Sequence, residues 1–243
     1  MDLNKRFESE KLKKIQIFDA AQLKYIAFLS MLIDHVNNSI VTHFLTGKGW
    51  LLYVSNFLSI LGRIAFPIFI FFIVEGFFKT HDRLKYLRNL LVFAIISEIP
   101  FDMFTSKVFF DPYWNNMMFT LALCLVTIWL IDYLKSKITN KIFWYFVSIV
   151  IVIAFGFLAM LLSLDYDYNA IILAYLFYIF YDKPVISAGL GYLSIIKQVY
   201  SCLGFFMTVC YNGKKGRQNK LVNYLFYPVH LFLLALVRYY FNF

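Results

Sequence analysis

Seven ionisable side chains interrupt the long apolar stretches of this sequence. They are Asp34, His35, Arg63, Glu75, Glu98, Asp102 and His230. If these stretches are helices in a bilayer, each charge costs at least about 2.5 kcal/mol there, so it needs a partner or a water-filled cavity. Imidazoles among carboxylates can take up and release protons close to neutral pH. This combination predicts either general acid–base catalysis or a proton relay.

The spacing of these residues limits which of them can act together. Glu98 and Asp102 are four residues apart, so one helix face presents both carboxylates, and such a pair needs a cation or a proton. We expect Arg63 to pair with Asp34 or with one of these acids, and a buried ion pair that only holds helices together is the simpler alternative. Asp34 and His35 are adjacent, so their side chains diverge by about 100° on a helix.

The composition shows which elements must position these groups. The chain has 243 residues, of which 61% are hydrophobic and 15% charged, and its mean hydropathy is +0.69. A soluble domain is about 45–50% apolar and about 25% charged, so an integral membrane protein is predicted. The formal charge is +9, but Lys and Arg occur in short clusters between apolar runs. Because cytoplasmic membrane loops have this pattern, we expect a lipid bilayer and no nucleic acid as the partner.

Membrane helices are the predicted elements, because about 20 apolar residues are needed to cross about 30 Å of hydrocarbon. Candidate helices cover 20–44, 51–78, 86–104, 116–134, 141–163 and 221–241. The stretch 51–78 is too long for one crossing without a tilt or a break.

The remaining apolar stretches are harder to divide. Residues 170–181 form a short run, and 185–211 is apolar except for Lys197 and Gln198. An excess of Lys and Arg on the cytoplasmic side places the basic segment 1–19 inside and requires that 185–211 crosses twice or re-enters as a hairpin. We predict an all-α, polytopic bundle of about nine membrane segments in one domain over 1–243, with seven full spans plus a hairpin as the variant.

Signatures of several other chemistries are missing from the sequence. No GxSxG, HExxH or GxGxxG motif occurs, which argues against membrane proteolysis and a nucleotide-binding loop. Cys124, Cys202 and Cys210 lie inside apolar runs without metal-ligand spacing, so we expect no metal.

Six motifs spread over most of the chain resemble those of a known family. They are MLIDH at 31–35, GRIAFPIF at 62–69, VEGF at 74–77, SEIPFD at 97–102, YNG at 211–213 and FYPVHL at 226–231. Together they resemble the TraX family, membrane proteins linked to acetylation of the N-terminus of conjugative pilin and similar to the wider class of transmembrane acyltransferases. The stretch 164–169 also resembles a family segment, but 167–169 replaces a glycine-containing turn, which weighs against a role for Asp165.

The resemblance implies transfer of an acetyl group from acetyl-coenzyme A to an amine or a hydroxyl, with pilin or another peptide as one candidate acceptor. His35 is the predicted base and His230 the second candidate. Asp34 is expected to hold the acceptor cation or orient the imidazole, and Arg63 to neutralise the acids or polarise the thioester oxygen. The residues predicted to bind substrate are Arg63, Glu75, Glu98 and Asp102.

Coenzyme A would enter from the cytoplasm, where basic side chains can neutralise its phosphates. The candidates are Arg83, Lys85, Arg88, Lys214, Lys215 and Arg217. The alternative for these clusters is that they only set the topology. The predicted location is the bacterial plasma (inner) membrane.

Two rival functions use the same residues. A proton-coupled transporter would use the acids and histidines as a relay. A non-catalytic assembly protein for a surface appendage would not need His35 or His230. The enzyme interpretation requires that these two histidines face one solvated cavity, and it leaves direct transfer and an acyl-histidine intermediate both open.

Overall fold

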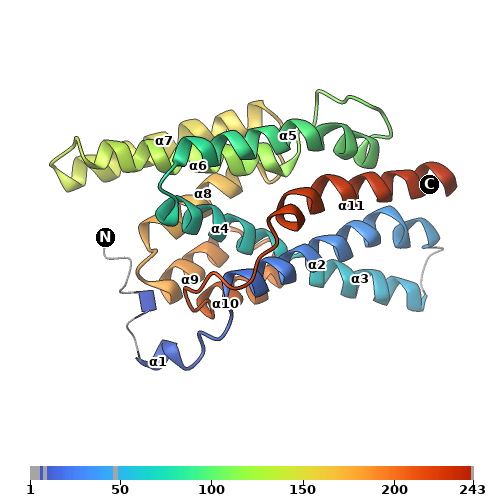
Figure 1. Cartoon of the computed structure of the whole chain (residues 1–243), viewed down its shortest axis with the longest axis horizontal. Coiled ribbons are helices and arrows are strands. Elements are labelled where there is room, and N and C mark those ends of the chain that lie inside the picture. Colours follow the sequence, from blue (N-terminus) through green and yellow to red (C-terminus); the bar gives the residue numbers. More distant parts are fainter. Residues whose placement is uncertain (1–5, 8–9, 46–48, 242–243) are drawn as a thin grey trace.

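The computed structural model describes residues 6–7, 10–45 and 49–241, and this part of the chain is all-helical (Figure 1). Its helices are α1 (Glu10–Lys13), α2 (Ala20–Ser39), η2 (Val41–Phe44), α3 (Trp50–Gly62), α4 (Ala65–Lys79), α5 (Arg83–Thr105), α6 (Met117–Lys135), α7 (Lys141–Leu161), α8 (Asp167–Ile179), α9 (Pro184–Ser194), η3 (Val199–Ser201), α10 (Cys202–Val209) and α11 (Lys220–Phe241). Two isolated bridges are the only β pairing in the described residues. The prediction of an all-α fold is confirmed.

Polar caps fix where the long helices begin. Asp19 and Gln22 form a reciprocal capping box at the start of α2. The side chain of Asn116 accepts from the backbone N–H of Met118 at 2.9 Å and so caps α6. Each cap satisfies backbone N–H groups that a helix leaves without an internal partner, which sets the register of the residues that follow.

The long apolar stretch at 51–78 is broken, which is one of the two outcomes, a tilt or a break, that its length predicted. α3 ends at Gly62 and α4 begins at Ala65. The hydroxyl of Ser30, on α2, donates to the carbonyl oxygens of Leu61 (2.7 Å) and Gly62 (3.1 Å). These bonds satisfy carbonyls at the helix end, which would be costly to leave without partners inside a bilayer. The break therefore lies directly against α2.

Four helical stretches in the described residues are long and apolar enough to cross a membrane. They are Trp50–Lys79, Met117–Lys135, Lys141–Leu161 and Val222–Phe241. Large apolar side chains on α7 point outward, with Ile142 82% and Ile153 66% exposed. An exposed apolar surface of this kind suits contact with lipid.

The segment 185–211 is divided between α9 and α10, with the break at 195–201 that the sequence predicted near Lys197. At 1.5 Å per residue α9 is about 16 Å long and α10 about 12 Å, so neither can cross about 30 Å of hydrocarbon alone. These lengths favour the hairpin over two crossings. The total of nine segments and the orientation stay predictions.

Several basic segments meet at one end of the molecule (Figure 1). The backbone N–H of Ala20 donates to the carbonyl of Lys214 at 2.9 Å, and Lys79 Nζ donates to the carbonyl of Gly213 at 2.7 Å. These contacts join the start of α2 and the end of α4 to the loop between α10 and α11. The C-terminal part of α11 lies at the other end, beside the loop that follows α5.

Candidate functional site

Two histidines from distant parts of the chain meet where α2 packs against α11. His35 Nδ1 lies 2.8 Å from His230 Nε2, and the two rings are nearly parallel, at 5° with centroids 5.1 Å apart. His230 is buried and stacks on Phe226, while the ring of His35 also contacts Phe104. The structure brings together the two imidazoles that the sequence predicted to share one cavity, but of the two it places His35 at the cavity and His230 behind it.

The hydrogen bonds of His230 indicate which nitrogens carry protons. His230 Nδ1 lies 2.6 Å from the carbonyl oxygen of Phe226, and a carbonyl only accepts, so this nitrogen must be protonated. In a neutral His230, the lone pair of Nε2 then accepts from the Nδ1–H of His35. This assignment leaves His35 Nε2 as a proton acceptor.

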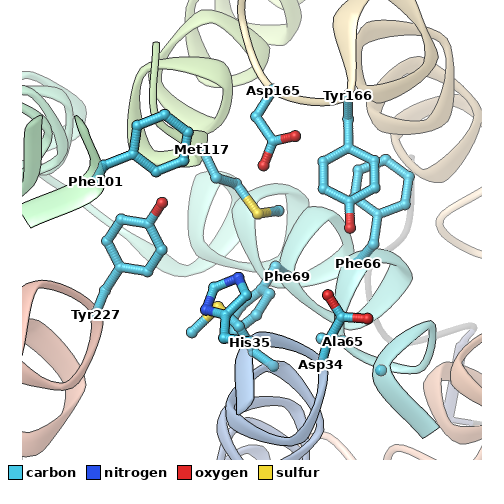
Figure 2. A pocket seen from close by; sticks show the side chains of 12 residues that line it. Asp34, His35, Ala65, Phe66, Phe69, Phe101, Met117, Asp165, Tyr166 and Tyr227 are labelled. Atoms are coloured by element: carbon cyan, nitrogen blue, oxygen red, sulfur yellow. The ribbon is translucent and has the colours of Figure 1, made fainter. Parts of the chain in front are cut away.

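A cavity of about 40 Å³ lies beside His35 (Figure 2). Its polar lining comes from Asp34, His35, Asp165, Tyr166 and Tyr227, and aromatic, methionine and small side chains supply the rest. Figure 2 shows the carboxylates of Asp34 and Asp165 on opposite sides of this space. Since one water needs about 10–15 Å³ of such volume, the cavity has room for a few waters or a small polar group.

Asp34 lies at the wall of the cavity that the α3–α4 break forms. Its Oδ2 accepts from Asn38 Nδ2 at 3.0 Å, and its Oδ1 is buried with no hydrogen-bond partner among the described residues. The expected ion pair of Arg63 with Asp34 or another acid is wrong for the described part of the chain, where the close ion pairs are those of Glu75 and Asp132. Arg63 follows the end of α3, where the chain turns, and its side chain is half-buried. Its positive charge acts on the Asp34 carboxylate from a distance, without an ion pair between them.

Asp165 is the cavity residue that sequence reasoning placed outside the site. It lies in the turn between α7 and α8, and its neighbour Tyr166 stacks on Phe66 in the cavity wall, with ring centroids 3.8 Å apart. Tyr227 was also missed, although it lies three residues before His230 in the FYPVHL motif at 226–231. Asp165 could have been found because it lies in a stretch, 164–169, that resembles a family segment. The sequence argued against it because a glycine-containing turn is replaced at 167–169.

Glu98 and Asp102 lie outside the cavity and anchor the loop 106–116 instead. Glu98 accepts from the backbone N–H of Asn116 at 3.3 Å and from its side-chain amide. Asp102 is fully buried and accepts from the backbone N–H of Asp111 at 2.9 Å. Ser106 donates to the exposed Asp111 carboxylate at 2.5 Å and lowers its pKa. Both predicted substrate-binding acids therefore act on the loop that leads into α6.

Glu75 lies in a separate cluster at the basic end of the molecule. It is 4% exposed, accepts from the hydroxyls of Tyr181 and Tyr211, the latter at 2.7 Å, and pairs with Lys79 at 2.6 Å. Arg6 is buried nearby and donates to the carbonyl of Tyr181 at 3.0 Å. The structure does not bring Glu75 to the cavity, and its contacts hold α4, the segment after α8 and the segment after α10 together.

We expect Glu75→Ala to destabilise the protein by about 2–5 kcal/mol, because two buried hydroxyls and a cation lose their acceptor. The midpoint of thermal unfolding in detergent should fall by roughly 10 °C, measured by tryptophan fluorescence. Glu10→Ala, at an exposed position, is the matched control and should leave the midpoint unchanged. Equal midpoints for both variants would contradict this role for Glu75.

The predicted coenzyme A residues lie on loops and helix starts around the same end. Arg83 pairs with Asp132 at 3.2 Å and lies over the ring of Phe77. The exposed members of the set are Lys85, Arg88, Lys214, Lys215 and Arg217. A wide depression beside Arg217 is also lined by Tyr25. These positions leave most of the predicted set accessible.

The fold and the site define a helical protein with several helices long and apolar enough to cross a membrane, in which His35, Asp34 and Asp165 face an internal cavity and His230 contacts His35 from behind it. In its described residues, no group of three or more His, Cys, Asp or Glu could hold a metal ion. A family model described as "TraX protein" matches residues 19–238, so the chain belongs to the TraX family. It is similar to the "Probable fimbrial assembly protein FimC, serogroup H1" of Dichelobacter nodosus, with 29% identity over 90% of this chain and 95% of the relative. No solved structure matches the chain.

Proposed function

We propose that the protein is a membrane-embedded acyltransferase that moves an acetyl group from acetyl-coenzyme A to an amine or hydroxyl, such as the N-terminus of a pilin-like peptide. The observation that carries the proposal is the contact of His35 with His230, which leaves His35 Nε2 as a base beside a polar cavity. The resemblance to a family linked to pilin acetylation supports it, and so does a relative named for fimbrial assembly.

The histidine pair supplies the base that this reaction requires. An α-amino group has a pKa of about 7.7–8.0, so it is mostly protonated at neutral pH and must lose a proton before it attacks. His35 Nε2 takes this proton, and His230 Nε2 stabilises the resulting imidazolium by accepting from His35 Nδ1. The amine then forms a bond to the acetyl carbon as the C–S bond breaks. The nitrogen releases its second proton, and the thiolate takes up the first one from His35.

Coenzyme A contributes the acetyl thioester, and the basic end of the protein suits its phosphates. Lys214, Lys215 and Arg217 are exposed and can neutralise several negative charges. Arg83 is a weaker candidate because it already pairs with Asp132. The acetyl group is small enough for the cavity beside His35, which limits the acyl groups that can react there.

We expect purified protein in detergent to transfer radiolabelled acetyl from acetyl-coenzyme A to an acceptor from a panel of peptides, small amines and alcohols. Product formation is measured after chromatographic separation, and hydrolysis of acetyl-coenzyme A without an acceptor is followed in parallel. Because a positioned base contributes about 10²–10⁴-fold, the signal should depend on His35. Neither transfer nor hydrolysis by the folded protein would contradict the proposal.

A non-catalytic assembly protein is the second candidate, favoured by the name of the Dichelobacter nodosus relative, a probable fimbrial assembly protein. In that case His35 and His230 serve only to join α2 and α11. Variants that remove the base but keep the packing should then support appendage assembly as well as the unmodified protein does. The enzyme requires loss of activity in the same variants with the fold retained.

A further inference from the structure

The turn that carries Asp165 is held in a strained backbone conformation. Ser163, Tyr166 and Asp167 have φ angles of 47°, 64° and 45°, and none of them is glycine. Side chains make this left-handed region unfavourable, so such residues persist only where surrounding contacts enforce them, and they concentrate at functional sites. Three of them within five residues point to a conformation that the protein maintains for a purpose.

The contacts that enforce this turn all surround Asp165. Thr120 Oγ1 donates to the carbonyl of Asp165 at 2.7 Å, and the backbone N–H of Asp165 donates to the carbonyl of Asn115 at 3.1 Å. The backbone N–H of Asn115 in turn donates to the carbonyl of Ser163 at 3.0 Å. Asn115 and Thr120 therefore fix both the N–H and the carbonyl of Asp165, and Asn115 also fixes Ser163 at the start of the turn.

The strained turn places the Asp165 carboxylate at the cavity. Its neighbour Tyr166 forms part of the wall by stacking on Phe66, with an interplanar angle of 4°. Across the cavity lie Asp34 and His35 (Figure 2). Within the described residues neither aspartate forms an ion pair with a basic side chain. Arg63 acts on both carboxylates only from a distance. Two carboxylates at one small cavity, without direct contact to a basic side chain of the described residues, favour a cation there.

We propose that Asp165 is the specificity-determining residue that binds the acceptor as an ammonium ion, with Asp34 as the second carboxylate, so that the site prefers amines to hydroxyls. This inference rests on the proposed function and names the residue that selects its acceptor. The bound ammonium gives one proton to His35 Nε2, and the amine attacks the acetyl carbon as the C–S bond breaks. The second proton from nitrogen is released, and the leaving thiolate is protonated by His35. A hydroxyl acceptor carries no charge and gains nothing from Asp165.

Glycinamide and glycolamide test this assignment, because glycinamide carries an ammonium group at the position where glycolamide carries a hydroxyl. Wild type should acetylate glycinamide faster, and Asp165→Asn should lower kcat/KM for glycinamide by about 30-fold, as expected for a lost hydrogen bond to a charged group. The value for glycolamide should change far less, because a neutral hydroxyl makes no charge-assisted hydrogen bond with Asp165. Asp165→Glu, which keeps the charge, should recover part of the loss. A glycinamide-to-glycolamide ratio that Asp165→Asn leaves unchanged would overturn the assignment.

Binding without acetyl-coenzyme A separates this inference from the proposed function. Ligand-observed NMR should detect glycinamide on the wild type and on Asp167→Asn, an exposed neighbouring acid that serves as the matched control. It should not detect glycinamide on Asp165→Asn, with folding of each variant checked by size-exclusion chromatography. Absence of binding to wild type, or equal binding to all three proteins, overturns the cation site. If glycinamide binding depends on Asp165 but the protein shows neither transfer nor hydrolysis, the proposed acyltransferase function is wrong and the cation site at Asp165 still holds.

Discussion

Replacing His35 with glutamine is expected to lower the rate of acetyl transfer by about 10³-fold, since a positioned general base contributes about 10²–10⁴-fold. Glutamine keeps a donor and an acceptor of similar reach, so packing against His230 should be preserved. Its amide cannot take a proton from an ammonium at neutral pH. Single-turnover transfer with saturating acetyl-coenzyme A measures the effect on the chemical step directly.

His230→Gln should have a smaller effect, because His230 acts on the acceptor through His35. Glutamine can still accept a hydrogen bond from His35 Nδ1, but it does not stabilise an imidazolium as an imidazole does. His81→Gln is the matched control, at an exposed position between α4 and α5, and should retain full activity. A His35→Gln protein that is folded and as active as His81→Gln would contradict the role of His35 as the base.

The sequence predicted the all-α fold and the meeting of His35 with His230, for a physical reason. Ionisable groups are too costly in lipid to point outward, so buried ones must find one another or a cavity. The length rule also predicted a tilt or a break within 51–78, because an unbroken, upright helix of that length exceeds the hydrocarbon thickness, and the structure shows the break. These predictions depend on local composition and on the properties of the bilayer, and both can be read from the chain.

The positions of the acidic residues could not be predicted in the same way. Glu98 bonds to an asparagine, and Glu75 bonds to two tyrosine hydroxyls in addition to Lys79. The asparagine and the tyrosines are neutral partners and give no charge signal in the sequence. Asp165 reaches the cavity only because tertiary contacts enforce a left-handed turn without glycine. Local propensity argues against such a turn, so a sequence pattern cannot reveal it.

Gly62→Ala is expected to lower transfer by about 10²-fold, because displacement of a catalytic group by about 1 Å costs that much. A Cβ built on Gly62 would lie 2.5 Å from Asp34 Cβ and 2.8 Å from Asp34 Cγ. Asp34 cannot move away freely, since it sits on α2 and its helix is tied to the α3–α4 break by Ser30. The substitution must therefore shift the carboxylate at the cavity or separate the two helices.

Gly189→Ala is the control that isolates this effect from the general preference of helices for alanine. Nothing lies within 4 Å of a Cβ at Gly189, which is in the middle of α9, so alanine there should keep activity and raise stability by up to about 1 kcal/mol. Transfer rates per folded molecule should separate the two variants, with folding measured by thermal unfolding. If Gly62→Ala is as active as Gly189→Ala, then the close packing of Asp34 against the break has no part in the chemistry. Loss of transfer with an unchanged unfolding midpoint would instead place the effect at the cavity, where Asp34 lies beside His35.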